Sequence, residues 1–438
     1  MDSGAASVRL CLSPQHSTGT NDMSTDAKKE TESAAAPDRF QELLETLDES
    51  GVPATIELLA RTLESEKKFP QLFEALLMKK RHQLGLALEG NDSIRDIPEE
   101  HRQEVEDYYV EVCQVIGGHL LANDKIGAAW PYFRAIDDPT KIAEAISAWE
   151  PPEDWGEYKE DEEENDDDDL DGIIEVAFNQ GAHPVRGYEL ILSHYGTCRA
   201  ITTFEHQFPY QGETREACGK LLIDQLYGEL LDSLRNDIET TEKKEPPKGT
   251  DVGELIAERD WLFESLGYHI DISHLQSCVR AAASLENPET IRKAIQMCDY
   301  GRRLGRDYQV TERPPFEDFY NDYRIMLRAL AGEGIDGAVR YYTSKMERAG
   351  ADEEGNNFPA EVLTFLLAKV GRPEDAIATY VEHLKDVPGP LSLCPSLLHL
   401  SAQAEDYAQL LEIAREKDDL LQFGLGLVKR AASSTQES

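Results

Sequence analysis

The chain has 438 residues, of which 40% are hydrophobic, and its 85 acidic and 44 basic residues give a net charge of −41. This apolar content is enough for folded cores in two or three domains, while the negative charge would repel nucleic acid and anionic lipid over most of the surface. We therefore expect no nucleic-acid partner and no membrane partner, and no run approaches the roughly 18 continuous apolar residues of a membrane helix.

The seven cysteines are widely spaced and include no C-x-x-C pair. An odd number of scattered cysteines is typical of neither a disulfide framework nor a zinc knuckle. The apolar stretch near the N-terminus is too short for a secretory signal. The sequence thus predicts a cytoplasmic protein.

Residues 1–38 are rich in Ser, Thr, Ala and Gly, and we predict a disordered tail there. Translation starts either at Met1 or at Met23, and the sequence does not decide between them. Residues 39–150 follow as an N-terminal helical domain with the apolar spacing of short helices. Strand-like alternation is almost absent from the whole chain, so the predicted fold is all-α.

The first of these helices shows the pattern that the others repeat. In RFQELLETLDESG, apolar residues occur at the i, i+3, i+4 and i+7 positions of one helical face, and Gly51 ends the helix. The residues on that face are Phe40, Leu43, Leu44 and Leu47.

Residues 151–171 form an acidic segment, which holds 13 acids and one lysine between residues 153 and 171. A solvated linker explains it best because like charges extend the chain, and Asp171 can cap the apolar helix that follows. Docking of a basic partner remains an alternative. An EF-hand calcium loop starting at Asp167 is disfavoured, because its twelfth position is Phe178 where calcium needs a bidentate Glu.

A middle helical unit is predicted at residues 172–242, and its most polar stretch is residues 183–206. Histidine and cysteine together suggest zinc; the candidate ligands are His183, His194, Cys198 and His206. Caps and turns are the structural interpretation, because Gly196 and Thr197 look like a helix end and a new N-cap. A third interpretation is a binding groove in which Arg186 binds a carboxylate and Glu205 binds a cation.

Residues 215–239 are predicted to form one long helix. Leucines recur in four-residue steps from Leu222 to Leu234, and Ile238 extends the stripe. So wide an apolar stripe must be covered. Packing against neighbouring helices is one solution, and self-association through this helix is the other.

A linker is predicted at residues 243–250, where two prolines and a glycine exclude a helix. A C-terminal helical array follows at residues 251–431, and residues 432–438 are predicted to be a disordered tail. Within the array, His274 and Cys278 share one helical face, but no further ligand is nearby in sequence. We therefore expect Cys278 to pack in the core.

In GRPEDAIATYVEHLKDVPG, Ala376 and Tyr380 are one helical turn apart and Pro388 ends the unit. This stretch resembles the second helix of a tetratricopeptide repeat, most clearly over residues 359–388. Weaker matches contain Ala338 and Tyr342, and Ala128 and Tyr132. The resemblance implies an α-solenoid of helix hairpins, although the 38-residue spacing between Ala338 and Ala376 departs from the repeat length of the family. An ordinary all-α globule is the alternative.

These features predict a non-enzymatic scaffold or adaptor that binds a protein or peptide and needs no cofactor. Tyr341, Tyr342 and Tyr380, together with Arg186 and Glu205, are the candidate binding surface. The alternative is an all-α enzyme or metal-binding protein with its site in residues 183–206. A structural subunit of a larger assembly is a third possibility. The sequence contains no G-x-S-x-G nucleophile motif, no H-E-x-x-H zinc motif, no P-loop and no dinucleotide-binding motif.

Overall fold

The structure is a computed structural model that describes residues 38–88, 97–151, 170–264, 268–352 and 356–436. As the sequence predicts, the fold is all-α, and the described residues contain no strand. The chain divides into two compact units, Met1–Tyr188 and Glu189–Ser438. This division lies within α7 (Pro184–Leu190), close to the polar stretch.

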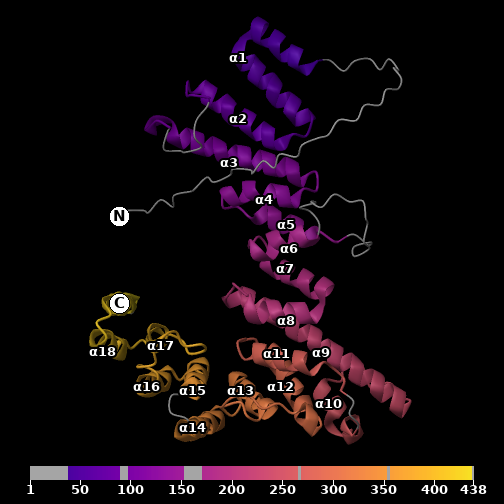
Figure 1. The fold of residues 1–438 in the computed structure, drawn as a ribbon, viewed down its shortest axis with the longest axis vertical. Coiled ribbons are helices and arrows are strands. Elements are labelled where there is room, and N and C mark those ends of the chain that lie inside the picture. The colour runs from indigo at the N-terminus through magenta and orange to yellow at the C-terminus, as the bar shows by residue number, and fades with distance from the viewer. Residues whose placement is uncertain (1–37, 89–96, 152–169, 265–267, 353–355, 437–438) are drawn as a thin grey trace, which may run out of the picture. The chain divides into compact units, whose positions relative to one another are not determined.

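The first unit is built from helices that pack mainly against their neighbours in sequence (Figure 1). These helices are α1 (Arg39–Ser65), α2 (Phe69–Gln83), α3 (Glu99–Leu121), α4 (Ile126–Ala135), α5 (Thr140–Ala148), α6 (Leu170–Ile174) and most of α7. A π-helical turn, Glu175–Asn179, follows α6. The α3–α4 contact is close because Gly117 has no side chain, and a Cβ there would lie 2.5 Å from the Phe133 ring.

Helix α1 consists of two shorter helices that meet at a kink, and the first ends at Gly51 as the sequence predicts. Gly51 adopts φ 76° between them, a left-handed conformation that glycine reaches without steric cost. Asp38 caps the first helix by accepting a hydrogen bond from the backbone N–H of Phe40. Of the residues on the predicted apolar face, Phe40, Leu44 and Leu47 are exposed. No neighbouring helix covers them among the described residues.

The second unit begins with the last residues of α7, a π-helical turn η3 (Ile191–Tyr195), and α8 (Gly196–His206). It continues with α9 (Gly212–Glu242), α10 (Val252–Ala257), α11 (Ile272–Ala282), α12 (Pro288–Arg303), α13 (Phe319–Leu330), α14 (Ile335–Asp352), α15 (Phe358–Lys369), α16 (Pro373–His383), α17 (Leu397–Gln403), α18 (Ala408–Glu416) and α19 (Leu420–Gln436). Short 3-10 turns, Asp260–Phe263 and Arg306–Tyr308, connect some of them.

Helix α9 is the long helix that the sequence predicts. Four other helices of this unit pack against it. Its stripe from Leu222 to Ile238 is buried, and α8, α10, α11 and α12 all pack on α9. The structure therefore uses these residues for internal packing. Cys278 on α11 is fully buried in the same core.

Residues 243–250 are linked to α9 by hydrogen bonds. Arg235 donates hydrogen bonds to the carbonyl oxygens of Pro247 and Thr250, at 3.1 and 3.0 Å. The Tyr227 hydroxyl accepts a hydrogen bond from the backbone N–H of Val252 at 3.1 Å. The segment predicted as a linker is thus an anchored turn inside the second unit.

From α12 onward, each helix packs chiefly against the next one in sequence. In the stretch that resembles a tetratricopeptide repeat, α15 and α16 pack together as a hairpin, and Ala376 is buried. Helix α19 extends to Gln436, so residues 432–436 are helical where the sequence predicts a disordered tail.

Candidate functional site

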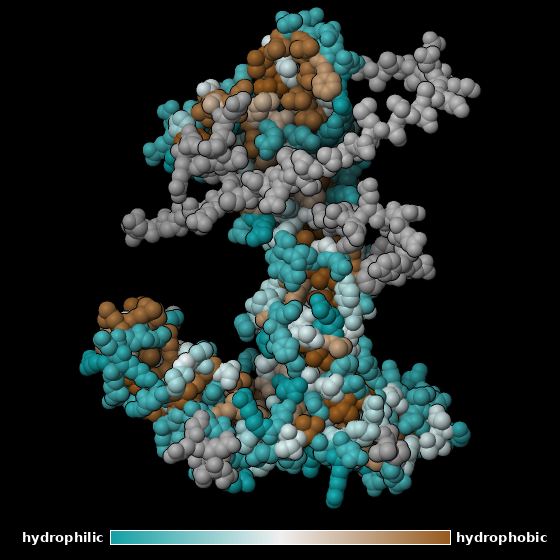
Figure 2. Space-filling view, in the orientation of Figure 1, coloured by the Kyte–Doolittle hydropathy of each residue, from teal (hydrophilic) through white to brown (hydrophobic). Residues whose placement is uncertain are grey.

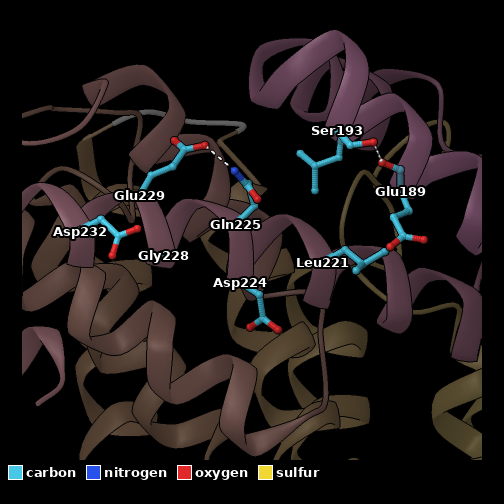
Figure 3. A pocket seen from close by; sticks show the side chains of 9 residues that line it. Glu189, Ser193, Leu221, Asp224, Gln225, Gly228, Glu229 and Asp232 are labelled. Atoms are coloured by element: carbon cyan, nitrogen blue, oxygen red, sulfur yellow. Dashed lines mark hydrogen bonds between the residues drawn. The ribbon is translucent and has the colours of Figure 1, made fainter. Parts of the chain in front are cut away.

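An open groove of about 460 Å³ lies beside α9 in the second unit (Figure 3). One wall comes from the end of α7 and from η3, and contributes Glu189, Leu192 and Ser193. The other wall is one face of α9, formed by Leu221, Asp224, Gln225, Gly228, Glu229 and Asp232. Four of these lining residues are acidic and none is basic.

The α9 wall arises from the helical repeat. Asp224, Gly228 and Asp232 follow one another at four-residue intervals and therefore lie on one face, opposite the buried leucines. A Cβ at Gly228 would meet no atom within 4 Å, so the absence of a side chain there leaves the groove open. The groove volume falls in the range of pockets that bind small ligands.

Hydrogen bonds fix two of the groove carboxylates. The Glu229 carboxylate accepts from the Thr197 hydroxyl at 3.0 Å and from the Gln225 amide at 2.9 Å. The Thr197 side chain on α8 is therefore hydrogen-bonded to α9. The prediction that Thr197 caps a helix is wrong, because α8 begins without a side-chain cap.

Asp224 is paired with two lysines, Lys220 on the same helix and Lys293 on α12, the latter at 2.7 Å. Burial raises the pKa of Asp224, but the hydrogen bonds from these lysines outweigh burial and leave the pKa below its ordinary value. Asp224 is therefore ionised at neutral pH. The groove remains acidic because Glu189, Glu229 and Asp232 are present as well.

The predicted ligands in residues 183–206 do not form a metal site. Among the residues that the structure describes, no three histidine, cysteine or carboxylate side chains gather closely enough to hold a metal ion. Gly196 has φ 80° and interrupts the helix between His194 and Cys198, as the sequence predicts. His183 caps α7, because its Nδ1 lies 3.4 Å from the backbone N–H of Arg186. His206 lies in the last turn of α8.

Arg186 and Glu205 both have partners within the chain. Arg186 donates to the carbonyl oxygen of Trp149 and to the Glu150 carboxylate, each at 3.1 Å. Glu205 lies 3.4 Å from Arg280, which also pairs with Glu312. These two side chains fix neighbouring segments of the protein.

The predicted tyrosine surface is only partly at the surface. Tyr342 is fully buried, and its hydroxyl donates to the backbone carbonyl of Asp322 at 2.7 Å. Tyr341 is half-buried and donates to the Asp322 carboxylate at 2.6 Å, while Tyr380 is half-buried on α16. Tyr342 is therefore a core residue, and its burial excludes it from a binding surface.

Asp322 and Lys345 form a buried ion pair between α13 and α14, with a separation of 2.7 Å. Lys345 Nζ also donates to the Glu317 carboxylate and to the carbonyl oxygen of Pro315, so all its three donors are used. Burial raises the pKa of Asp322 against the opposing hydrogen bonds from Lys345 and Tyr341. This closed network holds the loop before α13 and leaves no group for a ligand.

Most of the acidic segment, residues 152–169, lies outside the described residues, as does the tail at residues 1–37. The part that is described begins with α6. Asp171 and Gly172 lie in its first turn, so Gly172 is helical where an EF-hand loop requires a sharp turn.

The groove was not predicted from the sequence. The detectable signal was the polar i, i+4 spacing of Asp224, Gly228 and Asp232 on the face of the long helix opposite its leucines. In so acidic a chain this spacing alone does not distinguish a groove from a solvated face. Glu189, which faces α9 from another segment, has no such signal in the sequence.

Comparison of the chain with protein-family models, curated proteins and solved structures gave no match. Within the described residues, no helix combines the length and the apolar composition that are needed to cross a membrane.

Proposed function

We propose that the chain is a non-enzymatic interaction protein that binds a lysine- or arginine-rich segment of a partner protein in the groove beside α9. The observation that carries this proposal is the groove itself, a concave site of about 460 Å³ with four acidic lining residues and no basic one. Extended side chains of lysine or arginine match its charge.

The electrostatics of the whole chain support a basic partner. With a net charge of −41, the protein attracts cationic segments from a distance and repels acidic ones. Long-range attraction raises the rate of encounter, and the groove supplies the specific contacts.

The architecture that we propose is a degenerate α-solenoid of helix hairpins. Its support is the succession of contacts between neighbouring helices from α12 to α19, and the pairing of α15 with α16 in the stretch that resembles a tetratricopeptide repeat. Solenoids expose long surfaces that stacking leaves free, and they commonly act as scaffolds.

The proposal predicts that neutralising the groove weakens binding of a cationic peptide. Glu229→Gln combined with Asp232→Asn removes two charges and keeps the side-chain shapes. Exposed charge pairs contribute about 0.5 kcal/mol each. Losing two of them should therefore weaken the Kd for a fluorescein-labelled octalysine peptide about fivefold. Fluorescence anisotropy at near-physiological salt concentration measures this Kd.

The matched control is Glu213→Gln combined with Glu239→Gln, which makes the same change in net charge at exposed positions of α9 outside the groove. We expect its Kd to change less than twofold. Equal losses in the two double variants would show that the peptide responds to the general charge of the chain, and would refute the groove as the site.

A further inference from the structure

The chain leaves an apolar helical face exposed at each end of its described sequence. In the first helix of α1, Phe40, Leu44 and Leu47 are spaced i, i+4, i+7 and are between 43% and 66% exposed. The spacing places them in one stripe about 10 Å long. Figure 2 shows hydrophobic surface over this helix.

The last helix, α19, has a stripe of the same spacing. Leu421, Leu425 and Val428 are between 38% and 71% exposed, and Leu420 beside them is 83% exposed. Helix α18 packs against the opposite face of α19, where Gly426 is buried. Terminal helices of a stacked array ordinarily present a polar outer face, because an apolar one invites further stacking. Both terminal helices here depart from that rule.

The two helices that bear the stripes carry opposite charges. The first helix of α1 holds Glu42, Glu45, Asp48 and Glu49, and its one cation, Arg39, is paired with Glu66. Helix α19 contains Lys429 and Arg430 and has no acidic residue between Leu420 and Gln436. Pairing two copies of the same stripe would bring like charges together, whereas pairing the two different stripes brings opposite charges together.

We propose that the apolar face of α19 binds the first helix of α1 of a second copy of this chain. The contact is head-to-tail, so a pair of copies keeps one unused α1 and one unused α19, and further copies add to form a closed ring or a linear assembly. The proposal is independent of the groove beside α9, which lies on other residues.

The test uses two double variants of the full chain, whose oligomeric state is followed by sedimentation velocity. Phe40→Glu with Leu44→Glu disables the α1 stripe, and Leu421→Glu with Val428→Glu disables the α19 stripe. We expect the mass of the wild-type protein to rise with concentration, and each variant alone to remain at the monomer mass of 49.1 kDa.

The decisive sample is the equimolar mixture of the two variants. One supplies an intact α19 and the other an intact α1, so we expect a 1:1 dimer at twice the monomer mass and no larger species. A misfolded variant or a symmetric contact through one stripe does not produce this recovery. Circular dichroism checks that each variant is helical, and Leu44→Ser and Leu421→Ser give the same test with smaller changes.

The matched control is Val110→Glu with Val115→Glu, which replaces two exposed valines on α3. It should associate like the wild-type protein. Wild-type protein that is monomeric at every concentration would overturn the proposal. The stripes would then be covered by another part of the same chain or by a different protein. A mixture of the two stripe variants that stays monomeric would overturn it too.

Discussion

Single side chains hold neighbouring helices and loops together in this protein. Lys345 is the clearest case, because its ammonium group donates to Asp322, Glu317 and a backbone carbonyl, and so ties α13 and α14 to the loop before α13. Asp322 is fully buried, and therefore depends on these partners for its solvation.

Lys345→Met should destabilise the protein strongly. Removing one partner of a buried ion pair leaves the other charge uncompensated, at a cost of about 3–5 kcal/mol. Urea unfolding measures the change. Lys369→Met is the control, because the partner Glu286 is exposed and the pair contributes less than about 1 kcal/mol. Adding Asp322→Asn to Lys345→Met should recover part of the loss, and a purely additive double variant would contradict the coupling.

At the scale of the helical element, boundary residues decide where each helix begins. Asp271 caps α11 by accepting hydrogen bonds from the backbone N–H groups of Ser273 and His274, at 2.8 and 3.2 Å. Its carboxylate also accepts from the Ser273 hydroxyl. These hydrogen bonds, led by that from the Ser273 side chain, hold the pKa of Asp271 below its ordinary value.

Asp271→Ala should cost about 1 kcal/mol of the free energy of unfolding at pH 7, because helix α11 loses its cap. The folded-state pKa is lowered, so the ionised cap stabilises the fold above the unfolded pKa of about 3.9 and loses that contribution as the pH falls through the folded value. The difference between Asp271→Ala and wild type should therefore shrink in acid. Chemical denaturation at pH 7 and at a pH below the folded-state pKa of Asp271 measures the difference. Asp271→Asn is the control, because its side chain can cap the helix but does not titrate. A difference independent of pH would contradict this account.

At the scale of the whole molecule, repulsion between negative charges is the main electrostatic effect on stability. A net charge of −41 makes every compact state repel itself, and salt screens that repulsion over a distance of about 10 Å at 0.1 M. The described ion pairs are mostly at the surface, where each contributes little.

Raising the salt concentration from about 0.01 to about 0.3 M at pH 7 should therefore raise the Tm by a few degrees. Weaker repulsion in the folded state outweighs the weakening of surface ion pairs. Differential scanning calorimetry measures the shift, with sucrose as a control for effects other than screening. A Tm that falls with salt would mean that attractive pairs contribute more than the general repulsion.

The sequence by itself determined the helical class, the end of a helix at Gly51, the break at Gly196 and the long helix whose leucines run from Leu222 to Leu234. These features depend on local backbone preferences and on the helical repeat, which a sequence expresses directly. It could not tell which apolar or polar face would meet another helix. The apolar faces at Phe40 and at Leu222 both follow the helical repeat, yet the first is exposed and the second is buried, because among the described residues only the second is covered by neighbouring helices. For the same reason only the tertiary structure placed Tyr342 in the core and brought Glu189 to face α9 across an acidic groove.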